Sequence, residues 1–240
     1  MDLGISGKRA AVAAASAGLG YASAATLAAE GVQVAICGRD RARIDDAAER
    51  IGHGCVPLVA DVGDAPGGEA FVAAAVEALG GLDILVTNAG GPPPGNFAST
   101  PVSAYPDAID LNLMSVVAMC KAAVPAMQQQ GWGRVVAITS VSVRQPIAEL
   151  ILSNTARAGV TGFLKTLARE VAADGVTVNS AQPGLHRTDR VTSLYGDTSE
   201  LTMGDPADFG AVVAFLCSEQ ARFTTGVQLH VDGGSYAALL

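Results

Sequence analysis

The first residues that could do chemistry form a glycine-rich turn near the N-terminus. The apolar run 8–13 leads into Ala14-Ala15-Ser16-Ala17-Gly18-Leu19-Gly20, and a helical stretch follows. Glycines let the backbone approach a pyrophosphate, and the start of the following helix offers free N–H groups. Ser16 adds a hydroxyl for a phosphate oxygen. Such a turn is as often a simple tight turn, so its position after the first strand is what favours nucleotide binding.

A second group lies at the end of the predicted strand 33–37, where Gly38-Arg39-Asp40 follows. In α/β nucleotide-binding folds this point faces the adenosine ribose, and an acidic residue there bonds the 2′-hydroxyl of NAD. Gly38 instead leaves room for a 2′-phosphate, with which Arg39 can pair. We therefore expect NADP(H) in preference to NAD(H). The alternative is a surface arginine that pairs with Asp40.

Short apolar runs alternate with Ala-rich helical stretches along the whole chain. This alternation predicts right-handed βαβ units and an α/β fold, a doubly wound parallel sheet of the Rossmann type with helices on both faces. No linker divides the sequence, so we predict a single domain over residues 1–240. The predicted strands cover 8–13, 33–37, 55–59, 83–87, 133–139, 175–179 and 227–231, and the predicted helices cover 19–30, 41–51, 66–79, 103–130, 151–173 and 206–217.

Composition and charge exclude several classes of protein. Only 16% of residues are charged and the net charge is −8, which argues against nucleic acid or an anionic membrane as partner. Cys37, Cys55, Cys120 and Cys217 form no C-x-x-C pair, so they are interpreted as thiols in a reducing compartment, with no metal site. We see no signal pattern and no apolar run near the roughly 18 residues of a membrane span. A soluble, cytoplasmic protein is expected.

Six further motifs follow one another along the chain. They are Asp61-Val62, Thr87-Asn88-Ala89-Gly90, Asp110-Leu111-Asn112-Leu113, Ile138-Thr139-Ser140, Pro183-Gly184 with Thr188-Asp189, and Val231-Asp232-Gly233-Gly234. With these motifs the chain resembles the short-chain dehydrogenase/reductase family over essentially its whole length. It looks most like the 3-oxoacyl-ACP-reductase-like members.

The resemblance implies a set of cofactor contacts. Asp61 and Val62 would meet the adenine, the segment Asn88-Ala89-Gly90 would line the cofactor site, and the segment from Pro183-Gly184 to Thr188 would hold the nicotinamide carboxamide. The phosphate turn would contribute Ser16, Gly18, Leu19 and Gly20.

The proton chemistry departs from the family pattern. Its Tyr-x-x-x-Lys segment usually begins thirteen residues after the catalytic Ser, and counting from Ser140 reaches Ser153, with Arg157 at the Lys position. The resemblance implies a catalytic set of Ser140, Ser153, Arg157 and Asn112, with Arg157 also holding the nicotinamide ribose. Ser153 can hydrogen-bond a carbonyl but is a far poorer acid than a phenol. Arg157 should not exchange protons, because a guanidinium pKa lies above about 12.

A second departure is Ala13-Ala14, where the family usually has Thr-Gly. A Cβ at Ala14 costs little if φ is negative there, and about 1–2 kcal/mol if φ is positive.

The missing phenol raises the question of a replacement acid. His186 follows Pro183-Gly184-Leu185 near the expected nicotinamide position and has a suitable intrinsic pKa. Glu149 lies four residues before Ser153, and Tyr195 follows the Thr188 segment. Each of the three has a plainer interpretation as a structural or surface residue.

Three functions remain open from the sequence. The first is an NADP-dependent oxidoreductase that transfers hydride between nicotinamide and a carbonyl or alcohol. The second is an NADP-binding protein without redox turnover, such as a sensor or an assembly subunit, which the missing Tyr favours. The third is a non-redox lyase, dehydratase or isomerase that reuses the same site.

Substrate and assembly are less defined. The loops 91–97 and 191–203 are expected to cover a site for a small, partly apolar molecule, while Pro92-Pro93-Pro94-Gly95 is either part of the site or a rigid surface turn. The resemblance also implies a homotetramer or homodimer, with the helices near 103–130 and 151–173 between subunits.

Overall fold

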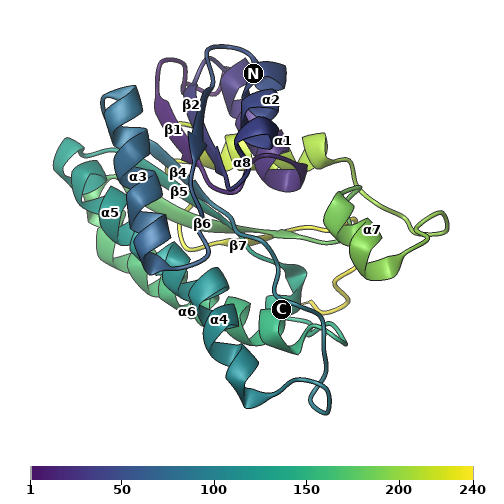
Figure 1. The fold of residues 1–240 in the computed structure, drawn as a ribbon. Helices are drawn as coiled ribbons and strands as arrows, with labels where there is room; N and C mark the ends of the chain where they lie inside the picture. The colour runs from purple at the N-terminus through teal and green to yellow at the C-terminus, as the bar shows by residue number, and fades with distance from the viewer. Residues whose placement is uncertain (1, 240) are drawn as a thin grey trace.

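A computed structural model describes residues 2–239 of the chain, in which a parallel sheet lies between two layers of helices (Figure 1). Its strands are β1 (Arg9–Val12), β2 (Gln33–Gly38), β3 (Val56–Val59), β4 (Ile84–Thr87), β5 (Gly133–Ile138), β6 (Val176–Pro183) and β7 (Gln228–Val231). The strand order is β3-β2-β1-β4-β5-β6-β7, and all pairs are parallel. The order reverses beside β1, which opens a crevice at the carboxyl ends of the strands. The predicted Rossmann architecture is confirmed.

The helices cover both faces of this sheet. They are α1 (Gly18–Ala29), α2 (Arg41–Ile51), α3 (Ala65–Leu79), α4 (Tyr105–Ile109), α5 (Ser115–Gln130), α6 (Ile151–Val171), α7 (Asp189–Tyr195) and α8 (Pro206–Cys217). Alternate residues of β1 pack into the cores on opposite faces of the sheet, because successive side chains of a strand point to opposite faces. Val12 packs in the cluster that holds Leu27 of α1 and Val213 of α8. Ala11 packs in the cluster that holds Phe71 of α3 and Met119 of α5.

Three elements differ from the sequence-based prediction. Strand β6 continues to Pro183 because Ser180–Pro183 pair with β7, so the strand carries the chain into the crevice. Helix α7 was not predicted; Thr188 begins it by accepting a hydrogen bond from the N–H of Val191. The predicted helix 103–130 is not uniform, because a π-helical turn at Asp110–Met114 separates α4 from α5. Such turns often mark functional sites.

The expectation that no apolar run approaches the length of a membrane span needs one correction. The helical stretch Val102–Gln130 is long and apolar enough to cross a membrane by length and composition alone, although half of its most apolar window is buried in the fold. Its main part, α5, lies against α3 and holds Met119 and Met127 in the core. This stretch is therefore built as a core helix of the α/β fold.

The four cysteines are free thiols. Burial raises the pKa of Cys37, Cys120 and Cys217 to about 12 and that of the partly buried Cys55 to about 11. Their reactive thiolates are therefore scarce at neutral pH. Within residues 2–239 no group of His, Cys, Asp or Glu is arranged to hold a metal ion.

Candidate active site

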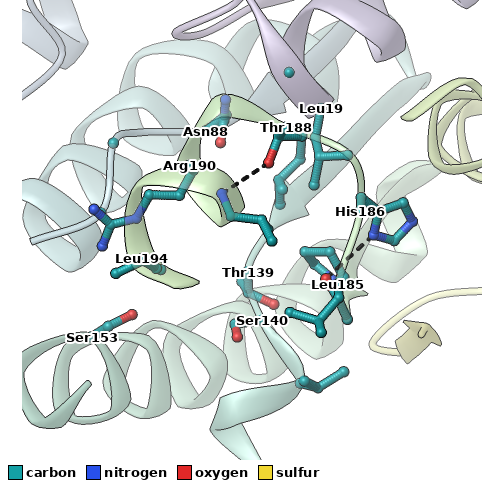
Figure 2. A pocket seen from close by; sticks show the side chains of 18 of the residues that line it. Leu19, Asn88, Thr139, Ser140, Ser153, Leu185, His186, Thr188, Arg190 and Leu194 are labelled. Atoms are coloured by element: carbon teal, nitrogen blue, oxygen red, sulfur yellow. Dashed lines mark hydrogen bonds between the residues drawn. The ribbon is translucent and has the colours of Figure 1, made fainter. Parts of the chain in front are cut away.

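A cavity of about 590 Å³ opens at the carboxyl ends of the central strands (Figure 2). It joins the glycine-rich turn to the residues that follow β4, β5 and β6. The predicted site residues that line it are Ser16, Gly18, Leu19, Asn88, Ala89, Gly90, Ser140, Ser153, Arg157, Pro183, Gly184 and Thr188. The predicted residues that do not line it are Gly20, Arg39, Asp61, Val62 and Asn112.

The glycine-rich turn has the form that a phosphate requires. Gly18 adopts φ +61°, and a Cβ at Gly20 would lie 2.7 Å from the carbonyl oxygen of Ala14. Helix α1 begins after Ala17, which provides no side-chain cap, so N–H groups of its first turn remain available to an anion. The turn therefore fits the pyrophosphate of a dinucleotide.

Ala14 adopts a left-handed backbone conformation, with φ +48°. Two hydrogen bonds to β2 and to the segment after β4 hold this conformation: the N–H of Ala14 donates to Cys37 Sγ at 3.3 Å, and Asn88 Nδ2 donates to the carbonyl of Ala14 at 3.1 Å. The turn therefore keeps its shape despite the Cβ. The cost of about 1–2 kcal/mol expected for a Cβ at a positive φ therefore applies to Ala14.

Replacing Ala14 by Gly should stabilise the protein by up to about 1.5 kcal/mol. The substitution relieves about 1–2 kcal/mol of left-handed strain and costs roughly 0.5–1 kcal/mol in unfolded-state entropy. Denaturant unfolding measures the difference. The control is Ala15→Gly, which removes a buried methyl at a position without positive φ and should destabilise the protein. A destabilised A14G variant would show that the turn prefers alanine.

Two arginines follow β2, and only the second of them lines the cavity. Arg39 is exposed, and within residues 2–239 it makes no ion pair with Asp40, whose carboxylate caps α2 by accepting from the N–H of Arg43 at 2.9 Å. The side chain of Arg43 lines the cavity beside the phosphate turn. The alternative in which Arg39 is neutralised by Asp40 is thus not supported by the geometry.

The predicted adenine contacts lie outside the cavity wall. Asp61 is exposed, and its Oδ1 accepts from the N–H of Gly63 at 3.0 Å, whereas Val62 is buried in the core. Both follow β3 at the carboxyl edge of the sheet, next to the end of β2.

Two asparagines fix the segment after β4. Asn88 bonds the phosphate turn as described, and Asn112, in the π-helical turn, donates from Nδ2 to the carbonyl of Gly90 at 2.9 Å. Asn112 is buried, and its Oδ1 has no hydrogen-bond partner in the described chain. The π-helical turn therefore supports the floor of the cavity from behind and does not form its wall.

Ser140, Ser153 and Arg157 come together at the other end of the cavity. The side chains of Ser140 and Ser153 face the cavity from the end of β5 and from α6 (Figure 2). Arg157 donates from Nε to Ser153 Oγ at 3.2 Å and from Nη1 to the carbonyls of Ile138 and Thr139, each at 3.1 Å. Since Oγ of Ser153 accepts from Arg157, its own proton is free to be donated to a ligand oxygen.

Burial, and then the positive charge of Arg190, lower the pKa of Arg157 to about 10. This is below the value above about 12 that the isolated side chain suggested. The guanidinium nevertheless remains protonated at neutral pH. Arg157 therefore supplies positive field and hydrogen bonds at this end of the cavity.

The proposed replacement acids have different surroundings. His186 is buried, its ring packs edge-on against Phe209, and Figure 2 shows it turned away from Ser153. Glu149 is exposed outside the cavity, where its Oε1 accepts from Asn96 Nδ2 at 2.9 Å. This geometry favours structural roles for both. His186 and Tyr195 both line the cavity, and Tyr195 belongs to the segment 191–203 that was expected to cover it.

Sequence reasoning missed several lining residues, among them Arg43, Gln145, Arg190 and Tyr236. Tyr236 comes from the C-terminal segment, two residues after the Val-Asp-Gly-Gly motif, and its ring lies 4.4 Å from that of His230. Arg190 comes from the unpredicted helix α7, which brings it across to the carbonyl of Pro92. Its position two residues after Thr188 was the available signal.

Comparison with known proteins agrees with this geometry. A family model described as Enoyl-(Acyl carrier protein) reductase matches residues 13–236. The human protein "Dehydrogenase/reductase SDR family member 4" is 32% identical over 249 residues, covering 98% of this chain and 90% of that protein. The 3-oxoacyl-[acyl-carrier-protein] reductase FabG of Vibrio cholerae is 33% identical over 242 residues, covering 98% and 99%.

Solved structures show the same arrangement of chain. L-Sorbose reductase from Gluconobacter frateurii, complexed with NADPH and L-sorbose, superposes with a TM-score of 0.92 at 29% identity, over 100% of both chains. An actinorhodin polyketide ketoreductase with NADPH superposes with a TM-score of 0.87 at 30% identity, over 96% of this chain and 98% of that one.

Proposed function

This chain belongs to the short-chain dehydrogenase/reductase family, and on that premise we propose that it is an NADP-dependent oxidoreductase acting on a carbonyl or alcohol. One observation carries the proposal: a single cavity joins a phosphate-binding turn to the hydroxyls of Ser140 and Ser153. The similar structures that contain NADPH support the choice of cofactor. Bound NADPH would supply the hydride.

The chain offers a binding residue for each part of the cofactor. Ser16, Leu19 and the N–H groups around Gly18 and Gly20 would hold the pyrophosphate, and Arg39 and Arg43 the 2′-phosphate. The adenine would meet Asp61 and Val62. The wall formed by Asn88, Ala89, Gly90, Pro183, Gly184 and Thr188 would position the nicotinamide end.

The residues around Ser153 suggest how a carbonyl would be activated. Ser140 and Ser153 would donate hydrogen bonds to the carbonyl oxygen, and Arg157 would stabilise the charge that develops there while also holding the nicotinamide ribose. Neither Ser153 nor Arg157 is a suitable acid at neutral pH, so a water molecule is the proposed proton source. The unpartnered Oδ1 of Asn112 could hold a water that supplies it.

A specific contact also favours the second function, NADP binding without turnover. Arg157 uses Nε and Nη1 to bond Ser153 and two carbonyls of the fold, which suits a structural residue as well as a catalytic one. Turnover of NADPH with any carbonyl compound would decide against this alternative.

The proposed cofactor site is tested by titrating the fluorescence of NADPH and NADH. We expect the protein to bind NADPH more tightly than NADH, and Arg39→Gln or Arg43→Gln to weaken NADPH binding by roughly tenfold while leaving NADH unchanged. The matched control is Arg41→Gln, whose exposed side chain pairs with Asp45 within α2. Equal affinity for both cofactors would refute the assignment to NADP(H).

We also propose a homotetramer or homodimer in the cytoplasm. The support for assembly is a groove between α5 and α6, lined by Val124, Pro125, Phe163 and Leu167, on the helices expected to meet between subunits. The four free cysteines support a reducing compartment. Elution as a 24.1 kDa monomer in gel filtration would contradict the assembly.

A further inference from the structure

Two arginines, Arg157 and Arg190, line the substrate side of the cavity, and neither pairs with a carboxylate of the described chain. Of the described lining residues only Asp189 carries a carboxylate; it lies in the first turn of α7 and, like Arg190, is exposed. The cavity is thus locally positive in a chain whose net charge is −8. An anionic ligand would be attracted to this positive charge.

The guanidinium of Arg190 is held in place at the mouth of the cavity. Its Nη2 donates to the carbonyl of Pro92 at 2.9 Å, and a Cβ at Gly91 would lie 2.5 Å from the same nitrogen. The loop is itself tied to the chain before α6, because the N–H of Gly95 donates to the carbonyl of Glu149 at 2.7 Å. Arg190 therefore has a fixed position and keeps other N–H donors free for a ligand.

Arg157 reinforces this site from below. With Nε and Nη1 occupied by Ser153 and the end of β5, its Nη2 makes no hydrogen bond within the described chain. The two guanidinium groups are near enough for Arg190 to contribute to the lowered pKa of Arg157. Their mutual repulsion would be relieved by a negative charge between them.

The surrounding wall strengthens the attraction for an anion. Leu194 lies beside Arg190 on the same side of the cavity as Ser153 (Figure 2), and Ile147 and Leu150 also line it. These apolar side chains exclude part of the water around the half-buried Arg157, so its attraction for an anion is stronger than in bulk water, whereas the exposed Arg190 gains less.

We propose that this side of the cavity takes a small carbonyl compound that bears a carboxylate, and that Arg190 is the residue that selects it. The carboxylate would accept hydrogen bonds from Arg190, while the carbonyl oxygen lies toward Ser140 and Ser153. The identity of the reacting group rests on the proposed function. The carboxylate site itself rests only on the two arginines and their surroundings.

The test separates binding from turnover. Calorimetric titration of the NADP⁺ complex compares three acids, 2-oxobutanoate, acetoacetate and levulinate, with their methyl esters, so that the distance from carboxylate to carbonyl varies. At least one acid should bind roughly tenfold or more tightly than its ester, because a charged hydrogen bond is lost in the ester. Arg190→Gln should abolish this preference, and Arg190→Lys should retain part of it. The control is Arg169→Gln, an exposed site on α6 with the same charge change.

Several outcomes would overturn the proposal. These are equal binding of acids and esters, no binding of any acid, or an acid preference that survives in Arg190→Gln. A matching loss of NADPH affinity in Arg190→Gln would assign the residue to the cofactor instead. NADPH oxidation with the same compounds is measured separately. An acid preference without NADPH oxidation would support the carboxylate site and contradict the redox function. Oxidation of NADPH with the esters alone would support the redox function and contradict the carboxylate site.

Discussion

Replacing Ser153 by Tyr and Arg157 by Lys together should raise the turnover of a simple ketone with NADPH by roughly 10²–10⁴, the usual contribution of a positioned general acid. Ser153 already faces the cavity on the helix position where the family carries its phenol. A phenol beside a lysine there could transfer the proton that serine cannot, because its pKa is several units closer to neutral. Ile147, Leu150 and Leu194 provide apolar contacts for the added ring.

The measurement is steady-state oxidation of NADPH with cyclohexanone. The control is Ser153→Phe with Arg157→Lys, which adds the ring and the amine without the hydroxyl and should gain little. If the Tyr/Lys variant binds NADPH but is no faster than the wild type, proton delivery does not limit the natural reaction. In that case another donor, such as Tyr195 or Tyr236 in the cavity wall, becomes the candidate.

Replacing Gly20 by Ala should weaken NADPH binding by tenfold or more. The new Cβ would lie 2.7 Å from the carbonyl oxygen of Ala14 and 2.8 Å from Asn88 Nδ2, which are the two atoms that hold the phosphate turn against the loop after β4. One of them must move, and losing their hydrogen bond costs about 1–3 kcal/mol. The fluorescence titration with NADPH measures the effect.

A matched control is Gly162→Ala, in the exposed face of α6 with no atom near the added methyl. It should bind NADPH normally and be more stable by up to about 1 kcal/mol, since alanine favours a helix over glycine. Thermal melting of both variants shows whether Gly20→Ala remains folded. Unchanged NADPH affinity in a folded Gly20→Ala protein would contradict the role given to the turn.

Much of this protein was determined by sequence patterns that act locally. Short, continuous apolar runs predicted all seven strands to within a few residues, since buried parallel strands are apolar on both faces. The motif residues Ser16, Asn88, Ser140 and Ser153 were predicted to belong to one site, and all line one cavity. Both results follow because the carboxyl ends of parallel strands meet at one edge of a sheet.

Tertiary structure decided what local patterns leave open. The sign of φ at Ala14 was set by Cys37 of β2 and by Asn88, which follows β4, because both bond its backbone. Whether His186 or Glu149 could act as an acid also depended on residues distant in sequence. His186 packs against Phe209, and Glu149 accepts a hydrogen bond from Asn96. Arg190 could not be placed because its helix, α7, is short, and short helices are fixed by packing more than by propensity. The sequence alone therefore determined the sheet, the glycine-rich turn and the missing phenol, and only the fold placed Arg157 and Arg190 in the wall of one cavity.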